Sequence, residues 1–581
     1  MPDSHEAKIA YFSMEIALEP AIPTYSGGLG VLAGDSLRSA ADLGVPMVGV
    51  TLIHRRGYFR QRLDSRGNQL EEDEIWSPEK LLEDTGARAY VDIERRRVCV
   101  RAWKYEMRGH SGHDVPVYLI DSDLSDNSPW DGAITDHLYG GDAHYRFCQE
   151  VLLGIGGVRI LRALGYKQIG SYHMNEGHAA LLSLELLEER LGNSDLGSAS
   201  LKDIEAIRSQ CIFTTHTPVP AGHDQFDREL MRQVLGAQRI RVLDVTHCCP
   251  EGRLDMTYLA LKFSRYINGV AMHHGEISQE LFPFYPIRAI TNGVHAVTWT
   301  AQAFRELYDR HIPEWRHDNL YLRYVRGISL DEIRSAHASA KRALLEAILT
   351  RTRIELSAAA FTIGFARRAA TYKRPELLFA NLDRLRRIAK EHGPLQVVFG
   401  GKAHPQDTNS KELIRRVIET AGSLKDAMRF VYVENYDMEW AHFITSGVDL
   451  WLNTPQRPQE ASGTSGMKAA LNGVPSLSVL DGWWIEGHAE GATGWSIGTD
   501  GDRGDSTAES VSLYDKLQET ILPCFYGRPY RFAEVMRSTI AINGSFFNTQ
   551  RMVSQYVANA YGPPERNVET RRTVSASQTA A

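Results

Sequence analysis

Between Phe361 and about Leu480 the sequence alternates short runs of strand-forming residues with longer helical patterns. The strand-like runs are 361–366, 395–400, 428–433, 448–452 and 476–480, and the helical stretches lie near 375–391, 408–421, 437–446 and 464–472. Strands that alternate with helices in this way form a parallel, doubly wound sheet. The second part of the chain is therefore predicted to be a Rossmann-like α/β domain.

The first part of the chain is predicted to hold a second sheet of the same kind with more insertions. Its strand-like runs are 8–12, 45–53, 169–174, 211–215, 268–272 and 287–291. Short alternating runs between Tyr58 and Ile120 predict inserted antiparallel hairpins. We expect an N-terminal domain over 1–330, a C-terminal domain over 331–562 with the boundary in the charged stretch 318–356, and a disordered tail over 563–581.

Composition narrows the class of protein. The 581 residues suffice for two large domains, and 65 Lys+Arg against 72 Asp+Glu give a net charge of −7. This balance provides no overall basic field for nucleic acid or membranes. No apolar run approaches the roughly 20 residues of a membrane span, and the N-terminus lacks a signal-peptide pattern. We expect a cytoplasmic protein without a metal, in which the adjacent Cys248 and Cys249 are idle or buried thiols.

Basic residues follow several predicted strands of the second domain. Ligands of an open parallel sheet bind beyond the carboxyl ends of its strands. Arg367, Arg368 and Lys373 follow the first of these strands, and Lys402 follows the next. Lys468 lies in the first turns of a predicted helix, where the helix dipole disfavours a cation, so we expect it to serve a ligand. Together these cations predict two anionic groups at one edge of the sheet.

Polar loops of the first domain are expected to face this edge. The run 25–30 (YSGGLG) would bring backbone amides close to a phosphate, although an ordinary tight turn fits it equally well. The clusters 175–178 (NEGH), 215–218 (THTP) and 291–295 (TNGVH) follow strands and are typical of a sugar-binding wall, because sugar hydroxyls need many neutral donors and acceptors. The pair Trp483-Trp484 would stack on a sugar or pack in the core.

Six of these segments, in order along the chain, resemble the α-glucan (glycogen, starch and maltodextrin) phosphorylase family. They are YSGGLGVLAGD (25–35), FTTHTPVPAGHDQF (213–226), TNGVHAVTW (291–299), GFARRAATYKRP (364–375), VFGGKAHP (398–405) and EASGTSGMKAALNG (460–473). The similarity is greatest to the shorter bacterial and archaeal branch. It implies a glycosyltransferase architecture of the GT-B type, in which two Rossmann-like domains face a central cleft.

The resemblance also implies pyridoxal 5′-phosphate held as a Schiff base by Lys468. Thr464, Ser465 and Arg367 would surround the cofactor phosphate, with Tyr436 nearby.

The remaining roles concern the substrates. Arg368, Lys373 and the Gly28 amide would bind the substrate phosphate, and His216 would lie beside the reacting anomeric carbon. The residues expected to contact the substrate are Glu460, Ser462, Gly463, Asn292, Glu176, Asn175, Gly27 and Leu29.

The implied reaction is reversible phosphorolysis of an α-1,4-glucan (glycogen or maltodextrin). Inorganic phosphate attacks the non-reducing terminal glucosyl unit and gives α-D-glucose 1-phosphate with retention. The cofactor phosphate exchanges a proton with the substrate phosphate in this family. Two phosphates that face each other repel unless cations lie beside both, which fits the cations predicted at this edge. We expect no carboxylate nucleophile of the glycosidase type.

The sequence differs from the family pattern at two places, and it leaves other functions open. The family motifs begin by Tyr11, so we expect the chain to lack the N-terminal extension that carries allosteric control in animal enzymes. The family relationship also leads us to expect a homodimer. Asp437 follows Tyr436 where long-form enzymes carry Arg. The alternatives are a GT-B glucosyltransferase with a nucleotide-sugar donor, such as a glycogen synthase, a non-catalytic glucan-binding homologue, or a phosphorylase with a different acceptor.

Overall fold

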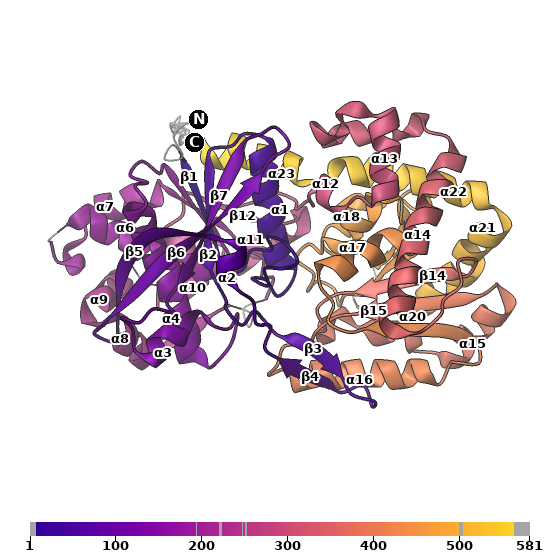
Figure 1. Ribbon diagram of the computed structural model, residues 1–581, viewed down its shortest axis with the longest axis horizontal. Coiled ribbons are helices and arrows are strands. Elements are labelled where there is room, and N and C mark those ends of the chain that lie inside the picture. The colour runs from indigo at the N-terminus through magenta and orange to yellow at the C-terminus, as the bar shows by residue number, and fades with distance from the viewer. Residues whose placement is uncertain are drawn as a thin grey trace, which may run out of the picture.

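The structure is a computed structural model, and it describes residues 7–192, 194–219, 223–246, 248–249, 252–498 and 504–562. Two open sheets with helices on both faces lie side by side, one in the indigo-to-magenta half and one in the orange half of Figure 1. The predicted α/β class with two Rossmann-like sheets is confirmed. The tail expected at 563–581 lies outside the described residues.

The second sheet has six strands, and every pair in it is parallel. The strands are β14 (Phe361–Ala366), β15 (Leu395–Gly400), β16 (Met428–Val433), β17 (Leu450–Asn453), β18 (Ser476–Val479) and β19 (Gly494–Ile497), in the order β16-β15-β14-β17-β18-β19. This is the 3-2-1-4-5-6 order of the dinucleotide-binding fold, whose crevice opens where the order reverses. Here the reversal lies between β14 and β17.

The helices of this half differ from the prediction at one place. They are α14 (Leu330–Thr352), α15 (Leu382–Glu391), α16 (Thr408–Gly422), α17 (Met438–Gly447), α18 (Ser465–Ala470), α19 (Trp484–Gly487), α20 (Ser506–Asp515), α21 (Leu522–Gly527) and α22 (Pro529–Thr539). The helix expected over 375–391 is split into a 3₁₀ segment, Pro375–Phe379, and α15. The Asn381 side chain accepts a hydrogen bond from the Arg384 amide and so begins a new helix.

The first sheet has nine strands in the order β13-β12-β9-β8-β1-β2-β7-β6-β5. They are β1 (Ile9–Ser13), β2 (Met47–Leu52), β5 (Glu83–Ile93), β6 (Arg96–Arg108), β7 (Asp114–Asp121), β8 (Ser171–Asn175), β9 (Cys211–Thr214), β12 (Tyr266–Gly269) and β13 (Ile287–Ala289). The strand predicted at 268–272 ends at Gly269, before α11 (Met272–Leu281). The inserted strands β5, β6 and β7 pair antiparallel and extend one edge of this sheet.

Helices cover both faces of this first sheet. They are α1 (Gly28–Asp42), α4 (Ala143–Val151), α5 (Gly157–Ala163), α6 (Leu182–Leu191), α7 (Leu201–Arg208), α8 (Arg228–Leu235), α9 (Ala237–Val245), α10 (Met256–Lys262) and α11, with the short α2 (Pro78–Leu81) and α3 (Pro129–Gly132) in the insertions. The buried apolar residues accordingly form one cluster on each face.

A small hairpin, β3 (Arg60–Leu63) with β4 (Gln69–Glu72), leaves the first half and lies beside α16 of the second (Figure 1). Gln69 Nε2 donates to the Ala403 carbonyl and the Ala403 amide donates back to Gln69 Oε1, both at 2.9 Å. Gln61 exchanges a similar pair of bonds with Asn435, both at 3.0 Å. The hairpin therefore fastens the first half to the loops that follow β15 and β16.

Two segments pack on the half opposite to the one that a division at residue 330 assigns them. Apolar residues of α12 (Ala296–Trp299) and α13 (Gln302–His311) belong to the core of the second half. Conversely, α23 (Thr549–Tyr556) returns to the first sheet, where the Tyr556 hydroxyl bonds Thr214 Oγ1 at 3.0 Å. The chain thus crosses between the two halves twice.

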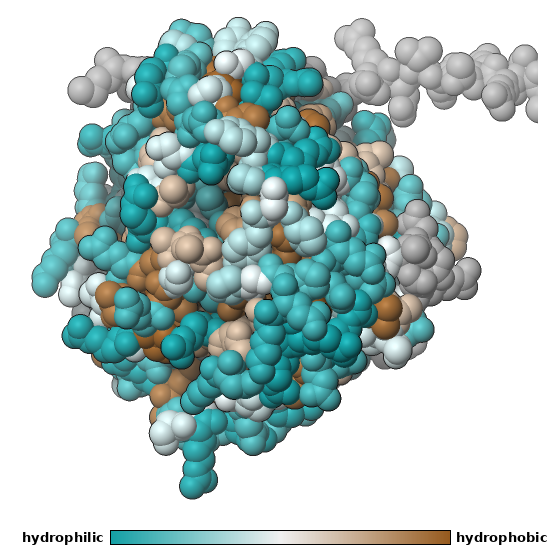
Figure 2. Space-filling model, turned by 90° about the vertical axis from the view of Figure 1, so that its right-hand side faces the viewer, coloured by the Kyte–Doolittle hydropathy of each residue, from teal (hydrophilic) through white to brown (hydrophobic). Residues whose placement is uncertain are grey.

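The face of the second half in Figure 2 is mostly hydrophilic, with scattered groups of hydrophobic residues. Among the helices that the structure describes, none is long and apolar enough to span a bilayer. The described residues also contain no cluster of three or more His, Cys, Asp or Glu side chains suited to a metal ion. Cys248 is buried, and Cys249 is partly buried.

Candidate functional site

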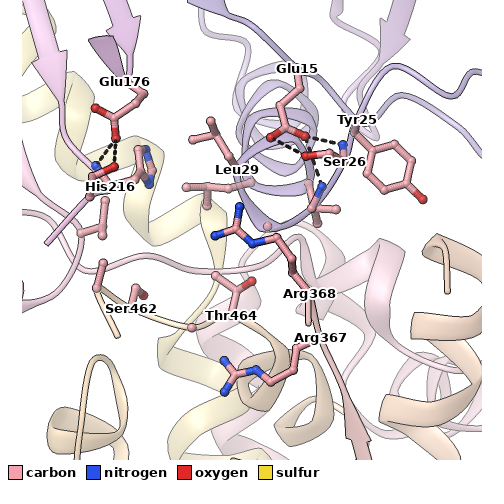
Figure 3. Close-up of a pocket in the computed structure, with 18 of the residues that line it drawn as sticks. Glu15, Tyr25, Ser26, Leu29, Glu176, His216, Arg367, Arg368, Ser462 and Thr464 are labelled. Carbon is pink, nitrogen blue, oxygen red and sulfur yellow. Dashed lines mark hydrogen bonds between the residues drawn. The ribbon is translucent and has the colours of Figure 1, made fainter. Parts of the chain in front are cut away.

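A cavity of about 660 Å³ lies between the two sheets. Its walls come from the loops that follow β1, β8 and β9 in the first half and β14, β15, β16 and β17 in the second. Both reversals of strand order, β1/β8 and β14/β17, open into it, as expected for ligand sites of open parallel sheets. Figure 3 shows Arg367, Arg368 and Thr464 on one side of this cavity and Glu15, Glu176 and His216 on the other.

The glycine loop at the start of α1 is held by Glu15. This carboxylate accepts the Ser26 amide at 2.5 Å and the Gly27 amide at 3.2 Å (Figure 3). A Cβ at Gly30 would lie 2.7 Å from Glu15 Oε2, so only glycine fits beside the carboxylate, whereas Gly28 faces open space. The fold therefore needs Gly30 for close packing and leaves the Gly28 backbone accessible to a ligand.

Two cations at the end of β14 share one carboxylate. Arg367 Nη2 donates to Glu460 Oε2 at 2.8 Å, and Lys373 Nζ donates to the same oxygen. Although burial would raise the pKa of Glu460, Arg367 and Lys373 lower it to about 2, so the group stays ionised. Among the described residues, Arg368 has no carboxylate within ion-pair distance, so its charge is available to an anionic ligand.

Lys468 is 6% exposed, and its Nζ lies 3.6 Å from the centroid of the Trp299 ring. Burial lowers the pKa of this amine to about 8, against the opposing effect of Asp35. No hydrogen-bond partner of Nζ occurs within the described part of the chain. An amine of this kind is about one-tenth deprotonated at pH 7, far more than an ordinary lysine, and its neutral form can act as a nucleophile.

The backbone around Lys468 is fixed by buried amide groups. Asn472 Nδ2 donates to the Lys468 and Trp299 carbonyls at 3.0 and 2.8 Å. Gly463 has φ +73°, and a Cβ at Gly466 would lie 2.7 Å from the Trp483 ring. The glycines of the motif therefore let the loop turn and pack tightly beneath the cavity.

Several buried polar atoms at the cavity have no partner within the described chain. They include Ser462 Oγ, Asn292 Oδ1, Arg367 Nε and Arg367 Nη1. Buried polar groups are rarely left unpaired, so these atoms indicate where a polar ligand binds. They lie on both sides of the cavity, which indicates a ligand that spans it.

The wall from the first half is built around His216. The His216 amide donates to Glu176 Oε2 at 2.8 Å, and the ring Nε2 lies 2.7 Å from Asn175 Oδ1. Burial lowers the pKa of His216 to about 3, so the imidazole is neutral at physiological pH. Glu176 also accepts from the Gly177 amide and the Thr217 hydroxyl, so its carboxylate shapes the loop around His216.

Every predicted site residue except Asn175 lines this cavity. Asn175 is 1% exposed and lies behind His216, on the side away from the cavity. The Ser465 hydroxyl accepts a hydrogen bond from Trp451 Nε1 at 3.1 Å. The Trp483 and Trp484 rings are buried in the core of the second half, which decides between the two interpretations of that pair.

Sequence reasoning missed Glu15, Trp299 and a charged group at the far end of the cavity, in which Arg146 and His178 both contact Asp224. Glu15 follows β1 directly, so the rule that located the other loops could have found it. Trp299 is the last residue of the motif 291–299, but it was not predicted because only charged and polar side chains indicated the site.

The two facing Rossmann-like sheets and the cavity between them are the architecture of GT-B glycosyltransferases. The family model of carbohydrate phosphorylases matches residues 223–494. The chain is 37% identical to a maltodextrin phosphorylase of Thermococcus litoralis, over 96% of this chain and 70% of that protein. It is 37% identical to a glycogen phosphorylase of Mycobacterium tuberculosis (99% and 72%) and 33% identical to one of Aquifex aeolicus (96% and 87%). The chain belongs to the carbohydrate phosphorylase family.

Proposed function

We propose that the protein is an α-1,4-glucan phosphorylase, which uses inorganic phosphate to release terminal glucosyl units of glycogen or maltodextrin as α-D-glucose 1-phosphate. The observation that carries the proposal is one cavity that unites a buried lysine of lowered pKa, the cations Arg367, Arg368 and Lys373 at the end of β14, and a polar wall around the neutral ring of His216. A sugar, a phosphate and a second anionic group match these three features.

The residues around Lys468 fit pyridoxal 5′-phosphate. The unpartnered amine of Lys468 suits covalent attachment, and Arg367 has two free donors, Nε and Nη1, for a phosphate group beside Thr464. Tyr436 closes the wall next to Arg367. When bound, the cofactor supplies a phosphate group that can exchange a proton with the substrate phosphate.

Arg368, Lys373 and the Gly28 amide would hold the substrate phosphate. Arg368 is the cation of this group without a carboxylate partner in the described chain, and the Gly28 backbone is accessible because no side chain covers it. Cations beside both phosphates offset the repulsion between them and stabilise their close approach. The lowered pKa of Glu460 ensures that Arg367 and Lys373 are fixed by an ionised partner.

The carboxylates at the cavity support a mechanism without an enzymatic nucleophile. Each is occupied: Glu15 and Glu176 accept backbone amides, Glu460 and Asp224 bind cations, and Asp437 accepts the Trp440 amide at the start of α17. A glycosidase needs two carboxyl groups free to face the sugar. The sugar hydroxyls would instead meet Ser462, the Gly463 backbone, Asn292 and the neutral His216 ring.

A nucleotide-sugar transferase is the second candidate from the same fold. It would grip a diphosphate with Arg and Lys but has no use for an enclosed amine such as Lys468. A phosphorylase with a different acceptor is consistent with the same cavity, so the chain length of the glucan is a matter for assay. We propose a homodimer in the cytoplasm on the family relationship alone.

Borohydride trapping tests the cofactor assignment. We predict that the purified protein incubated with pyridoxal 5′-phosphate and then reduced will carry the reduced adduct on the peptide that contains Lys468. The Lys468→Arg variant should lose the adduct, while the exposed-site variant Lys202→Arg keeps it. An adduct found elsewhere, or none at all, would count against the proposed function.

A further inference from the structure

The ring of His216 is oriented from behind by a chain of buried hydrogen bonds. His216 Nε2 contacts Asn175 Oδ1 at 2.7 Å, and Asn175 Nδ2 donates to Ser13 Oγ at 3.1 Å. Ser13 Oγ in turn donates to the Glu15 carbonyl at 2.7 Å. Ser13 and Asn175 are 0% and 1% exposed and face each other across the paired strands β1 and β8.

The direction of this chain is set by its last member. A backbone carbonyl can only accept, so the Ser13 hydroxyl must donate to Glu15 and accept from Asn175. The Asn175 amide group therefore turns its Nδ2 toward Ser13 and its oxygen toward His216. An amide oxygen accepts, so Nε2 of His216 must carry the proton.

The other ring nitrogen is then free. Nδ1 of the neutral ring has a lone pair, and among the described residues it has no hydrogen-bond partner. His216 lines the cavity between the two sheets, on the wall opposite Arg368 (Figure 3). A lone pair fixed at this wall can accept a hydrogen bond from a sugar hydroxyl, which Nδ1–H could not do.

We propose that Asn175 is a positioning residue that holds His216 in its Nε2–H tautomer and so presents Nδ1 to the sugar as an acceptor. Asn175 itself lies behind the ring and outside the cavity, so it acts on the substrate through His216. Ser13 fixes the orientation of the Asn175 amide. The contact with a sugar rests on the proposed function, whereas the tautomer of the free protein does not.

The tautomer is measured first, by NMR of the holoenzyme labelled with ¹⁵N-histidine and without sugar. Comparison with His216→Gln identifies the His216 signals. We expect a protonated Nε2 in the unmodified protein and a mixture of tautomers in Asn175→Leu, with the same change in Ser13→Ala. A protonated Nδ1 in the unmodified protein, or an unchanged tautomer in Asn175→Leu, would overturn the proposal.

Kinetics separate positioning from a merely structural role. Asn175→Leu should lower kcat/KM for maltodextrin about tenfold to a hundredfold, as expected when a hydrogen bond that orients a ligand-binding group is lost. In a His216→Gln background the same change should cost less than about twofold, because its effect passes through the ring. An equal loss in both backgrounds contradicts the proposal.

Asn319→Leu is the matched control. Asn319 is also 1% exposed and donates through Nδ2 to the Trp315 carbonyl, but neither Trp315 nor Gln550, its hydrogen-bond partners, lines the cavity. We expect it to lower stability without changing kcat/KM, and a kinetic loss equal to that of Asn175→Leu would overturn the positioning role. If the unmodified holoenzyme shows no phosphorolysis, the proposed function fails while the NMR result still decides on Asn175.

Discussion

The burial of Lys468 lowers the stability of the folded protein. Its amine has a pKa of about 8 in the folded protein and an ordinary value of 10.5 in the unfolded chain. Between these values the unfolded chain binds more protons, so stability rises with pH, and below pH 8 the full cost of about 3 kcal/mol is present. In the proposed function, this cost results from placing a reactive amine inside the cavity.

We therefore predict that Lys468→Met stabilises the cofactor-free protein at pH 7 by about 1 to 3 kcal/mol. The gain should shrink as the pH is raised from 8 past 10.5, because only above that value is the wild-type amine mostly neutral in both states. Denaturant unfolding of both proteins at pH 7 and pH 10 measures the difference. The exposed-site variant Lys202→Met should show neither effect, and a gain that does not depend on pH would contradict the assigned cause.

In the proposed function, Arg368 is the residue on which the use of phosphate depends most directly. Removing a cation from a buried anion site costs about 2 to 4 kcal/mol, so Arg368→Ala should lower kcat/KM for phosphate about thirtyfold to a thousandfold. Initial rates at varied phosphate measure this loss. Arg531→Ala removes a surface cation paired with Glu534 and serves as the control. Unchanged kinetics for phosphate would remove Arg368 from the site.

At the scale of strands and helices, the local sequence predicts where an element begins and ends but not what it packs against. The three strands β14, β15 and β16 have the predicted bounds, because runs of buried β-forming residues between helical patterns are a local signal. The hairpin β3–β4 was expected only as an inserted hairpin, and its attachment to the second half depends on Gln61 and Gln69. Glutamines that bond distant peptide groups carry no local pattern.

Sixteen of the seventeen residues expected from the strand ends and from the family resemblance line the cavity, and Asn175 is the exception. Asn175 is the last residue of β8 and is paired with Ser13 of β1, whereas Glu176 follows it with φ +73° in the loop that lines the cavity. Without the register of β1 and β8, the sequence does not tell which of the two faces inward.

The hairpin is predicted to hold the loops that carry Lys402 and Tyr436. Gln69→Ala removes both bonds to the Ala403 peptide group and should lower stability by about 1 to 3 kcal/mol. Hydrogen exchange should rise first in a peptide that covers 400–405. Arg66→Ala in the turn of the same hairpin changes an exposed side chain with no ion pair among the described residues and should leave that exchange unaltered. Equal exchange in both variants would argue that the hairpin rests on the second half without holding it.

At the scale of the whole molecule, the halves are joined in three ways: by the hairpin, by the crossing near residue 294 and by the return of α23. The sequence predicted two similar sheets but not these crossings, because a helix such as α23 packs on either sheet equally well as judged from its pattern alone. These connections tie the two walls of the cavity to each other. A ligand that spans the cavity needs this arrangement, since its binding groups come from both halves.

Phosphate-dependent cleavage is the most direct test of the proposed function. The holoenzyme is incubated with maltodextrin and inorganic phosphate, and the product is followed by ³¹P NMR. We predict that α-D-glucose 1-phosphate forms only when both substrates are present, and that UDP-glucose and ADP-glucose are not consumed. Consumption of a nucleotide sugar, or no phosphorolysis by protein shown to carry the cofactor on Lys468, would contradict the assignment as an α-glucan phosphorylase.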